Sequence, residues 1–243
     1  MKYIHYYSSS MNILQKMASS LGHLFYPHVC RGCGTDLLES HQLLCLHCIA
    51  DLPLTHFAAH EGNPVEKTFW GRIQVASAMS LLYFTPQSLV QHLVHQVKYN
   101  GQQKLAHYLG TMTGNEIFHS GRFGNIDMII PLPLYKSREI ERGYNQSFLL
   151  AKGIAEIINV PVMEKSVLRI HSTSTQTHKS RSERWQNVEG LFQLKNGFNP
   201  EGMNILLVDD VITTGATIDA CGSVINKIPG TTLNIATLAY ALQ

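Results

Sequence analysis

The sequence has few charged residues and no long apolar run. Charged side chains make up 15% of the 243 residues, against roughly 25% in an average soluble domain. No stretch approaches the roughly 18 consecutive apolar residues that a membrane-spanning helix requires. The first twenty residues also lack the continuous apolar core of a signal peptide. We therefore expect a cytoplasmic protein without a membrane span.

Two common nucleotide-binding motifs are absent as well. The chain contains neither the G-x-x-x-x-G-K-[ST] loop of P-loop proteins nor the G-x-G-x-x-G turn of dinucleotide-binding folds. Its 19 basic and 17 acidic residues leave a net charge of +2. So small a charge argues against a protein that coats nucleic acid by bulk electrostatics.

Cysteine is sparse, but it is concentrated in one place. Four of the five cysteines form two C-x-x-C pairs, Cys30 with Cys33 and Cys45 with Cys48. Two such pairs can surround one tetrahedral zinc ion with four thiolates, which leaves no open position for catalysis. Two local disulfides or a redox pair are the alternatives. A cytosolic setting disfavours the disulfides, and the doubled motif disfavours the redox pair. We expect a structural zinc ion.

The remaining cysteine, Cys221, lies far from this cluster in the sequence. It shares the apolar face of a predicted helix with Ile218 and Ile225. We interpret it as a buried small hydrophobic residue rather than a nucleophile.

After the cysteines, strand-like and helix-like segments alternate along the chain. Apolar strand patterns cover residues 75–84, 127–131, 204–208 and 233–240. Helical patterns cover residues 11–25, 88–119 with a break at Asn100-Gly101, 146–158, and the segment after residue 215. Strands that alternate with helices predict an α/β fold with a mainly parallel sheet covered on both faces. We expect an N-terminal helix over 1–25, a zinc module over 26–60 and an α/β domain over 61–243.

The segment after the strand at 204–208 is the most informative. Asp209 and Asp210 end an apolar run, and a loop with three threonines and Gly215 then leads into a helix. Unpaired N–H groups at a helix start attract anions. Carboxylates at a strand end accept hydrogen bonds from vicinal hydroxyls. The pattern predicts a site for a phosphorylated sugar. A helix capped by Thr213 or Thr214 is the simpler alternative, but it accounts for only one of these residues.

Residues 205–217 resemble the motif with which type I phosphoribosyltransferases bind PRPP, 5-phosphoribosyl 1-diphosphate. In a wider set of motifs the chain resembles the ComF family. These motifs are the four cysteines, Pro131-Leu-Pro133, Arg138, Arg142-Gly143-Tyr144-Asn145-Gln146, Thr175-Gln176, Arg184 and Asn187-Val188. Members of that family look like amidophosphoribosyltransferases and are associated with natural competence, the import of external DNA. The resemblance implies a type I phosphoribosyltransferase fold with an N-terminal zinc ribbon, and other competence proteins as partners.

The same resemblance implies a role for each matching residue. Asp209 and Asp210 would hold the ribose hydroxyls, and Mg2+ would ride on the diphosphate. The 5-phosphate would lie against Thr213, Thr214, Gly215, Ala216 and Thr217. The loop formed by Arg142, Gly143 and Tyr144 would approach the diphosphate.

A polar segment over residues 171–190 corresponds to a hood that closes over the substrate in that fold. Lys179, Arg181 and Arg184 would then neutralise charge on the departing diphosphate, and closure would exclude water. The alternative is a solvated loop with no ligand contact.

Three functions remain open from the sequence. The first is transfer of ribosyl 5-phosphate to an unidentified nitrogen nucleophile. The second is non-catalytic PRPP sensing or scaffolding in DNA uptake, and the third is binding of single-stranded DNA. Residues 135–184 carry nine Lys and Arg against five Glu, so this region suits polyanions. Tyr99, Tyr144 and Trp185 offer rings on which bases can stack.

Overall fold

The computed structural model describes residues 28–39, 41–170 and 190–242. The chain divides into two compact units, Met1–Ile49 and Ala50–Gln243. The described part of the smaller unit contains the two cysteine loops and the start of a short helix, α2 (Leu46–Ala50). The helix predicted over 11–25 lies outside the described residues. Among the helices that are described, none is long and apolar enough to cross a membrane.

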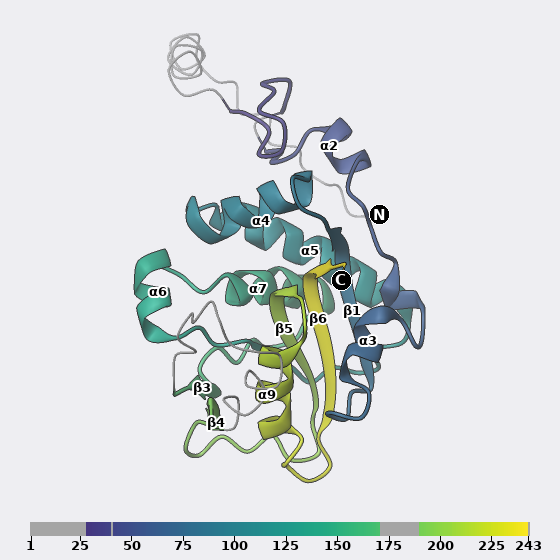
Figure 1. Cartoon of the computed structure of the whole chain (residues 1–243), viewed down its shortest axis with the longest axis vertical. Helices are drawn as coiled ribbons and strands as arrows, with labels where there is room; N and C mark the ends of the chain where they lie inside the picture. Colours follow the sequence, from purple (N-terminus) through teal and green to yellow (C-terminus); the bar gives the residue numbers. More distant parts are fainter. Residues whose placement is uncertain (1–27, 40, 171–189, 243) are drawn as a thin grey trace, which may run out of the picture. The chain divides into compact units, whose positions relative to one another are not determined.

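A sheet of four parallel strands forms the centre of the larger unit (Figure 1). The strand order is β1-β6-β5-β2, and all three neighbouring pairs are parallel. These strands are β1 (Ser77–Phe84), β2 (Met128–Pro131), β5 (Asn204–Ile212) and β6 (Thr232–Ala241). Their interiors are nearly continuous apolar runs, as expected for strands that are covered on both faces. The predicted parallel sheet is confirmed.

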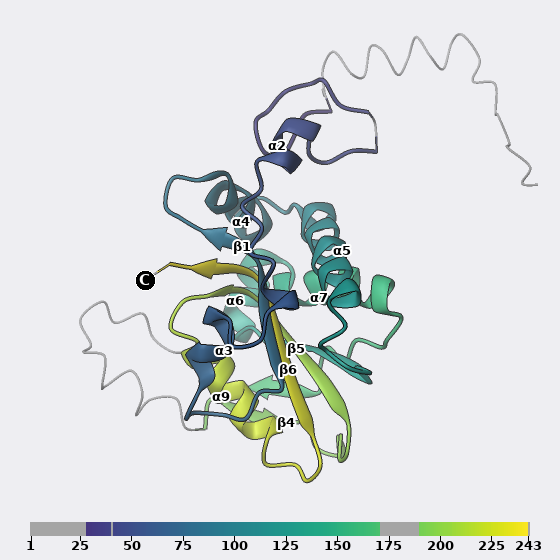
Figure 2. The ribbon, with the colours of Figure 1, turned by 90° about the vertical axis from the view of Figure 1, so that its right-hand side faces the viewer.

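Helices cover both faces of this sheet (Figure 2). α5 (Gln103–Ser120) and α7 (Gln146–Ile158) lie on one face, whereas α3 (Pro64–Phe69) and α9 (Ala216–Ile225) lie on the other. α5 and α7 approach closely because glycines stand where they cross. A Cβ added to Gly153 would lie only 2.1 Å from the carbonyl oxygen of His107.

Local sequence explains where several helices begin and end. Ser88 caps α4 (Leu89–Tyr99) by accepting from the Gln91 N–H, and Asn145 caps α7 in the same way through Ser147. The predicted break at Asn100-Gly101 separates α4 from α5, with Gly101 at a φ of +66°. β5 continues to Ile212, past its predicted end at 208.

Several short elements give no periodic signal in the sequence and were not predicted. They are the 3-10 turn η1 (Phe57–Ala59), α3, α6 (Lys136–Arg142) and the antiparallel pair β3 (Val167–Arg169) and β4 (Phe192–Leu194).

A buried polar network fixes α3 against the first strand of the sheet. The Asn63 side chain caps α3 and donates to the Ala78 carbonyl at 2.8 Å. The Glu66 carboxylate accepts from the Arg122 guanidinium at 2.9 Å and from the Ala78 N–H at 3.2 Å. Glu66 is 7% exposed, so this ion pair is well shielded from water. The network makes α3 a firm support on its side of the sheet.

The neighbouring strands β2 and β5 send the chain to opposite faces. After β2 the chain passes through α6 and α7, whereas after β5 it enters α9 on the other face (Figure 2). In open α/β sheets, ligands bind beyond the carboxyl ends of the strands at such a reversal. Asp209 and Asp210 stand near the carboxyl end of β5, so the fold puts them at the expected place for a ligand.

Candidate functional site

The two aspartates of β5 are held by the first turn of α7. The Ser147 hydroxyl donates to Asp209 Oδ1 at 3.0 Å, and the Gln146 amide donates to Asp210 Oδ2 at 3.0 Å. The backbone N–H of Asp210 also donates to Asp209 Oδ1, at 2.8 Å. Asn145 caps α7 and donates to the Leu132 carbonyl, and these bonds hold Gln146 and Ser147 in the first turn of α7.

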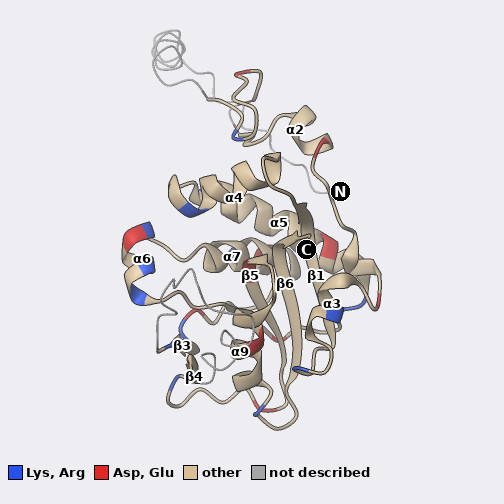
Figure 3. Cartoon of the chain, viewed as in Figure 1, with Lys and Arg blue, Asp and Glu red and all other residues tan. Residues whose placement is uncertain are grey.

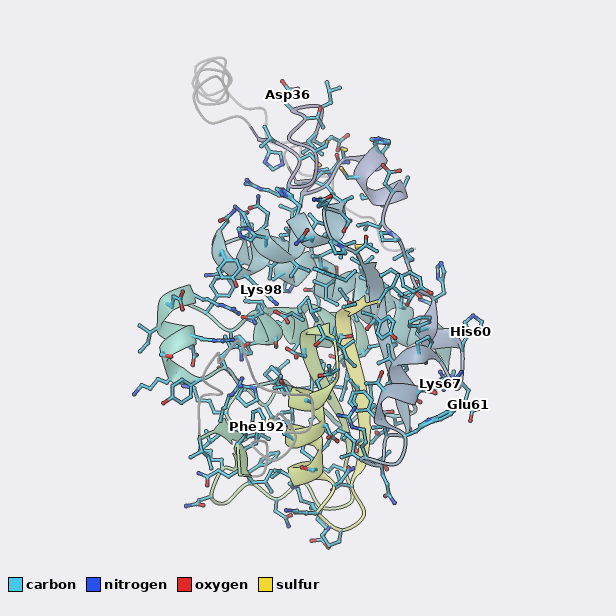
Figure 4. All side chains as sticks on the ribbon, viewed as in Figure 1. Asp36, His60, Glu61, Lys67, Lys98 and Phe192 are labelled. Atoms are coloured by element: carbon cyan, nitrogen blue, oxygen red, sulfur yellow. The ribbon has the colours of Figure 1, made fainter. Side chains whose placement is uncertain are left out.

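A lysine from a different helix pairs with the second aspartate. Lys98 Nζ lies 3.0 Å from Asp210 Oδ2, and the two side chains are 22% and 8% exposed. Figure 4 marks Lys98 near the end of α4. Asp210 thus has a cation, an amide and the Val211 N–H around its carboxylate. Asp210 is therefore buried and held by several partners, whereas Asp209 is only half-buried.

The electrostatics of the two aspartates are also unequal. Burial and the neighbouring charge of Asp210 raise the pKa of Asp209 to about 7, although the Asp210 N–H, Lys98 and Ser147 act in the opposite direction. A raised pKa means that the ionised form of Asp209 is under-solvated in the free protein. Hydroxyl donors from a ligand would relieve that deficit.

Gln146 supplies a second unsatisfied group beside the aspartates. Its side chain is 3% exposed, and its Oε1 accepts no hydrogen bond within the part of the chain that the structure describes. Buried polar atoms are ordinarily paired. A carbonyl oxygen without a donor next to two carboxylates is suited to a ligand hydroxyl.

The turn after β5 has two exposed threonines followed by a buried glycine. Thr213 and Thr214 are exposed, and Gly215 has a φ of +73°. Gly215 is the N-cap residue of α9, and as a glycine it contributes no side-chain cap to that helix. The alternative of a helix capped by Thr213 or Thr214 is therefore wrong. Ala216 and Thr217 form the start of α9, where N–H groups face outward from the helix end.

The Arg142 loop lies next to α4. Arg142 ends α6, and Gly143 follows with a φ of +75°. The Arg142 guanidinium lies 5.3 Å from the centre of the Tyr99 ring. The Tyr144 hydroxyl donates to the Val97 carbonyl, and burial raises the pKa of this phenol. The loop is thereby fastened to the helix that carries Lys98. In Figure 3 the ribbon of α6 carries both blue, basic and red, acidic positions.

Three residues of this site were missed in the sequence analysis. Lys98 and Ser147 sit in ordinary amphipathic helices, and only the fold brings them to the aspartates. Arg169 ends β3; burial and the charge of Arg138 lower its pKa, whereas the charge of Asp209 raises it. Nothing in the local sequence distinguishes it from a surface arginine. The predicted hood residues Lys179, Arg181 and Arg184 lie outside the described residues.

The four clustered cysteines converge in the smaller unit. The sulfurs of Cys30, Cys33, Cys45 and Cys48 all lie within 4.8 Å of one another. Cys30 Sγ accepts from the Gly32 and Cys45 N–H groups at 3.4 and 3.3 Å. Burial opposes ionisation of Cys30, but such backbone hydrogen bonds outweigh it and lower its pKa to about 6. Four sulfurs in this arrangement can hold a tetrahedral metal ion such as zinc. Cys221, by contrast, is fully buried, and burial raises its pKa.

Comparison with known proteins finds a phosphoribosyl transferase domain and relatives named for competence and DNA utilization. The family model described as "Phosphoribosyl transferase domain" matches residues 144–243. DNA utilization protein YhgH of Escherichia coli K12 is 30% identical over 210 residues, which cover 84% of this chain and 86% of that protein. Competence protein F of Haemophilus influenzae is 28% identical over 226 residues, 90% of this chain and 93% of the relative. Competence protein ComFC of Bacillus subtilis is 30% identical over 138 residues, about half of each chain.

Proposed function

This chain belongs to the ComF family of competence and DNA utilization proteins, and from that premise we propose that it binds PRPP together with Mg2+. The observation that carries the proposal is the set of groups around the carboxyl end of β5. Two carboxylates, and a buried Gln146 oxygen that has no partner among the described residues, stand at the end of the chain segment that leads into a helix with a glycine at its N-cap. Carboxylates and a carbonyl suit ribose hydroxyls, whereas the helix start suits a phosphate.

Each group of PRPP then has a partner of matching chemistry. Asp209 and Gln146 accept from the ribose hydroxyls, while Asp210 holds Gln146 in place. The 5-phosphate lies in the turn of Thr213, Thr214, Gly215, Ala216 and Thr217. Arg142, and the loop residues Gly143 and Tyr144 that support it, lie toward the diphosphate, with Lys179, Arg181 and Arg184 as further cations. Bound Mg2+ would supply charge neutralisation on the diphosphate oxygens.

Calorimetric titration with PRPP and Mg2+ tests this proposal. We expect binding by the wild-type chain and a loss of roughly ten-fold or more in affinity for Asp209→Ala, since a charge-assisted hydrogen bond contributes about 1.5–3 kcal/mol. Glu201→Gln removes an exposed carboxylate elsewhere and serves as the control. Absence of binding by the wild type, with its fold verified by circular dichroism, would overturn the proposal.

The reaction proposed for the bound PRPP is transfer of its ribosyl 5-phosphate group. In that reaction a nitrogen nucleophile attacks the anomeric carbon and diphosphate leaves. Release of diphosphate in the presence of a panel of nitrogen bases would support a transferase. PRPP binding without any release would favour the alternative, a non-catalytic PRPP sensor or scaffold.

We further propose a structural zinc ion on the four cysteines and a place of action in the cytoplasm, where thiols remain reduced. Metal analysis of freshly purified protein should find one zinc per chain.

The names of the relatives, DNA utilization protein and competence protein, favour single-stranded DNA and other competence proteins as partners. Direct DNA contact predicts an affinity that falls steeply with salt concentration, and salt-independent binding would contradict it.

A further inference from the structure

One arginine from outside residues 144–243, the part that the phosphoribosyl transferase model matches, reaches the turn after β5. Arg72 follows α3, and its Nη1 donates to two carbonyl oxygens, that of Thr68 at 2.8 Å and that of Thr214 at 3.0 Å. Its Nη2 lies 3.4 Å from Asp219 Oδ2. Thr214 belongs to the proposed phosphate turn, and Asp219 stands in the first turn of α9. Arg72 therefore joins α3, the turn and the start of α9.

This contact is largely removed from water. The Arg72 and Asp219 side chains are 19% and 16% exposed. Burial lowers the pKa of Arg72 and raises the pKa of Asp219, and in each case the charge of the partner acts in the opposite direction. A shielded pair of this kind holds its geometry better than an ion pair on an open surface.

The hydrogen bond to Thr214 also fixes the peptide that follows. In a planar trans peptide, the C=O and N–H point in opposite directions. Since the Thr214 carbonyl points toward Arg72, the Gly215 N–H points away from it. No acceptor for this N–H occurs among the residues that the structure describes. The guanidinium thus holds a free donor at the place where a phosphate oxygen would lie.

α3 supports the turn from the same side. A Cβ on Gly215 would lie 2.8 Å from Thr68 Cγ2 and 3.1 Å from Phe69 Cε1. The turn therefore rests directly on α3, which the Glu66 and Arg122 network holds in place. Arg72 and α3 together leave the turn little freedom to rotate.

We infer that Arg72 is a positioning residue for the phosphate turn: it fixes the Thr214–Gly215 peptide for anion binding and neutralises Asp219 at the start of α9. The inference rests on the proposed PRPP site and adds to it a part of the chain that precedes β1. Without Arg72, the Asp219 carboxylate would repel a phosphate at the same helix end. The turn would also lose the bond that orients the Gly215 N–H.

Two ligands that each correspond to a different part of PRPP can distinguish a positioning role of Arg72 from a general loss of structure. Ribose 5-phosphate carries the phosphate that the turn would bind, whereas inorganic diphosphate with Mg2+ lacks it. We expect Arg72→Met to weaken PRPP and ribose 5-phosphate at least ten-fold and to leave diphosphate affinity within about two-fold. Lys67→Met is the matched control, because Lys67 is an exposed cation on α3 that makes no contact with the turn.

A second variant guards against simple misfolding. Arg72→Met leaves the buried Asp219 carboxylate without its partner, so the double variant Arg72→Met/Asp219→Asn removes both charges. This double variant should unfold at the same temperature as the wild type. It should still bind ribose 5-phosphate weakly, because nothing then holds the Thr214 carbonyl.

The outcomes separate this inference from the proposed function. If the wild type binds PRPP, and both Arg72 variants bind ribose 5-phosphate as tightly as the wild type does, the positioning role is wrong and the PRPP site stands. Equal weakening of ribose 5-phosphate and diphosphate would also overturn positioning, because it indicates a general loss of structure. A wild-type chain that binds no PRPP would overturn the proposed function, and the role of Arg72 with it.

Discussion

Replacing Asp209 with asparagine should stabilise the protein while weakening its ligand affinity. The Asn side chain has almost the same shape, and its Oδ1 can still accept from Ser147 and from the Asp210 N–H, as Asp209 does. The change therefore removes the charge and preserves these hydrogen bonds. It isolates the effect of a carboxylate that is unfavourable in the free protein.

The magnitude follows from the pKa of Asp209, which burial and Asp210 raise from 3.8 to about 7. A carboxyl whose pKa is higher in the folded chain stabilises the fold below its unfolded pKa, and that contribution is lost as pH rises through the folded pKa. Each pKa unit corresponds to roughly 1.4 kcal/mol. The penalty at pH 8 is therefore on the order of 2–4 kcal/mol, with the lower figure allowing for solvent screening.

Thermal unfolding of wild type and Asp209→Asn between pH 5 and pH 8 measures this penalty. At pH 8 the variant should melt roughly 5–10 °C higher, given about 2–4 °C per kcal/mol for a chain of this size. Near pH 5 the difference should shrink to about a third, because folded wild type is then protonated at Asp209. The four clustered cysteines are common to both chains, so their titration cancels in the comparison. A variant that is no more stable at pH 8, or a difference independent of pH, would refute the reasoning.

Other substitutions have equally direct expectations. Gly215→Ala forces a non-glycine residue to a φ of +73° and brings its Cβ to 2.8 Å from Thr68, so it should destabilise the fold by about 2 kcal/mol in urea unfolding and weaken PRPP binding; an unchanged midpoint would contradict the close contact. Lys98→Met removes a cation that lowers the pKa of Asp209, so the carboxyl pKa measured by carbon NMR should rise further; a fall would contradict the ion pair's assigned effect. Cys48→Ser should remove bound zinc, as measured by metal analysis, and full retention would exclude the four-thiolate site. Gly153→Ala should destabilise by about 1–3 kcal/mol because its Cβ would meet the His107 carbonyl at 2.1 Å, and wild-type stability would show that the helices separate freely.

Elements with strong local signals could be predicted from the sequence. The buried strands needed only their apolar runs, and the structure confirms the helix predicted over 146–158 and the break predicted at Asn100-Gly101. The convergence of the four cysteines could be predicted because their spacing forms two C-x-x-C pairs.

Features that depend on contacts across the chain could not be predicted. Lys98 reaches Asp210 because Tyr144 fastens α4 to the loop before α7. Arg72 meets Thr214 because α3 packs beside the turn, although 142 positions separate the two residues. Neither residue stands in a motif, since its partner is chosen by tertiary packing rather than by sequence neighbours. The short α6 and the β3-β4 pair lack the periodicity on which such predictions depend.

A crystal structure of the chain with PRPP and Mg2+ tests the central claim most directly. The account predicts the 5-phosphate in the turn of residues 213–217, within hydrogen-bonding distance of the Gly215 N–H, and the ribose hydroxyls on Asp209 and Gln146. PRPP bound elsewhere, or with its ribose away from the β5 aspartates, would contradict it.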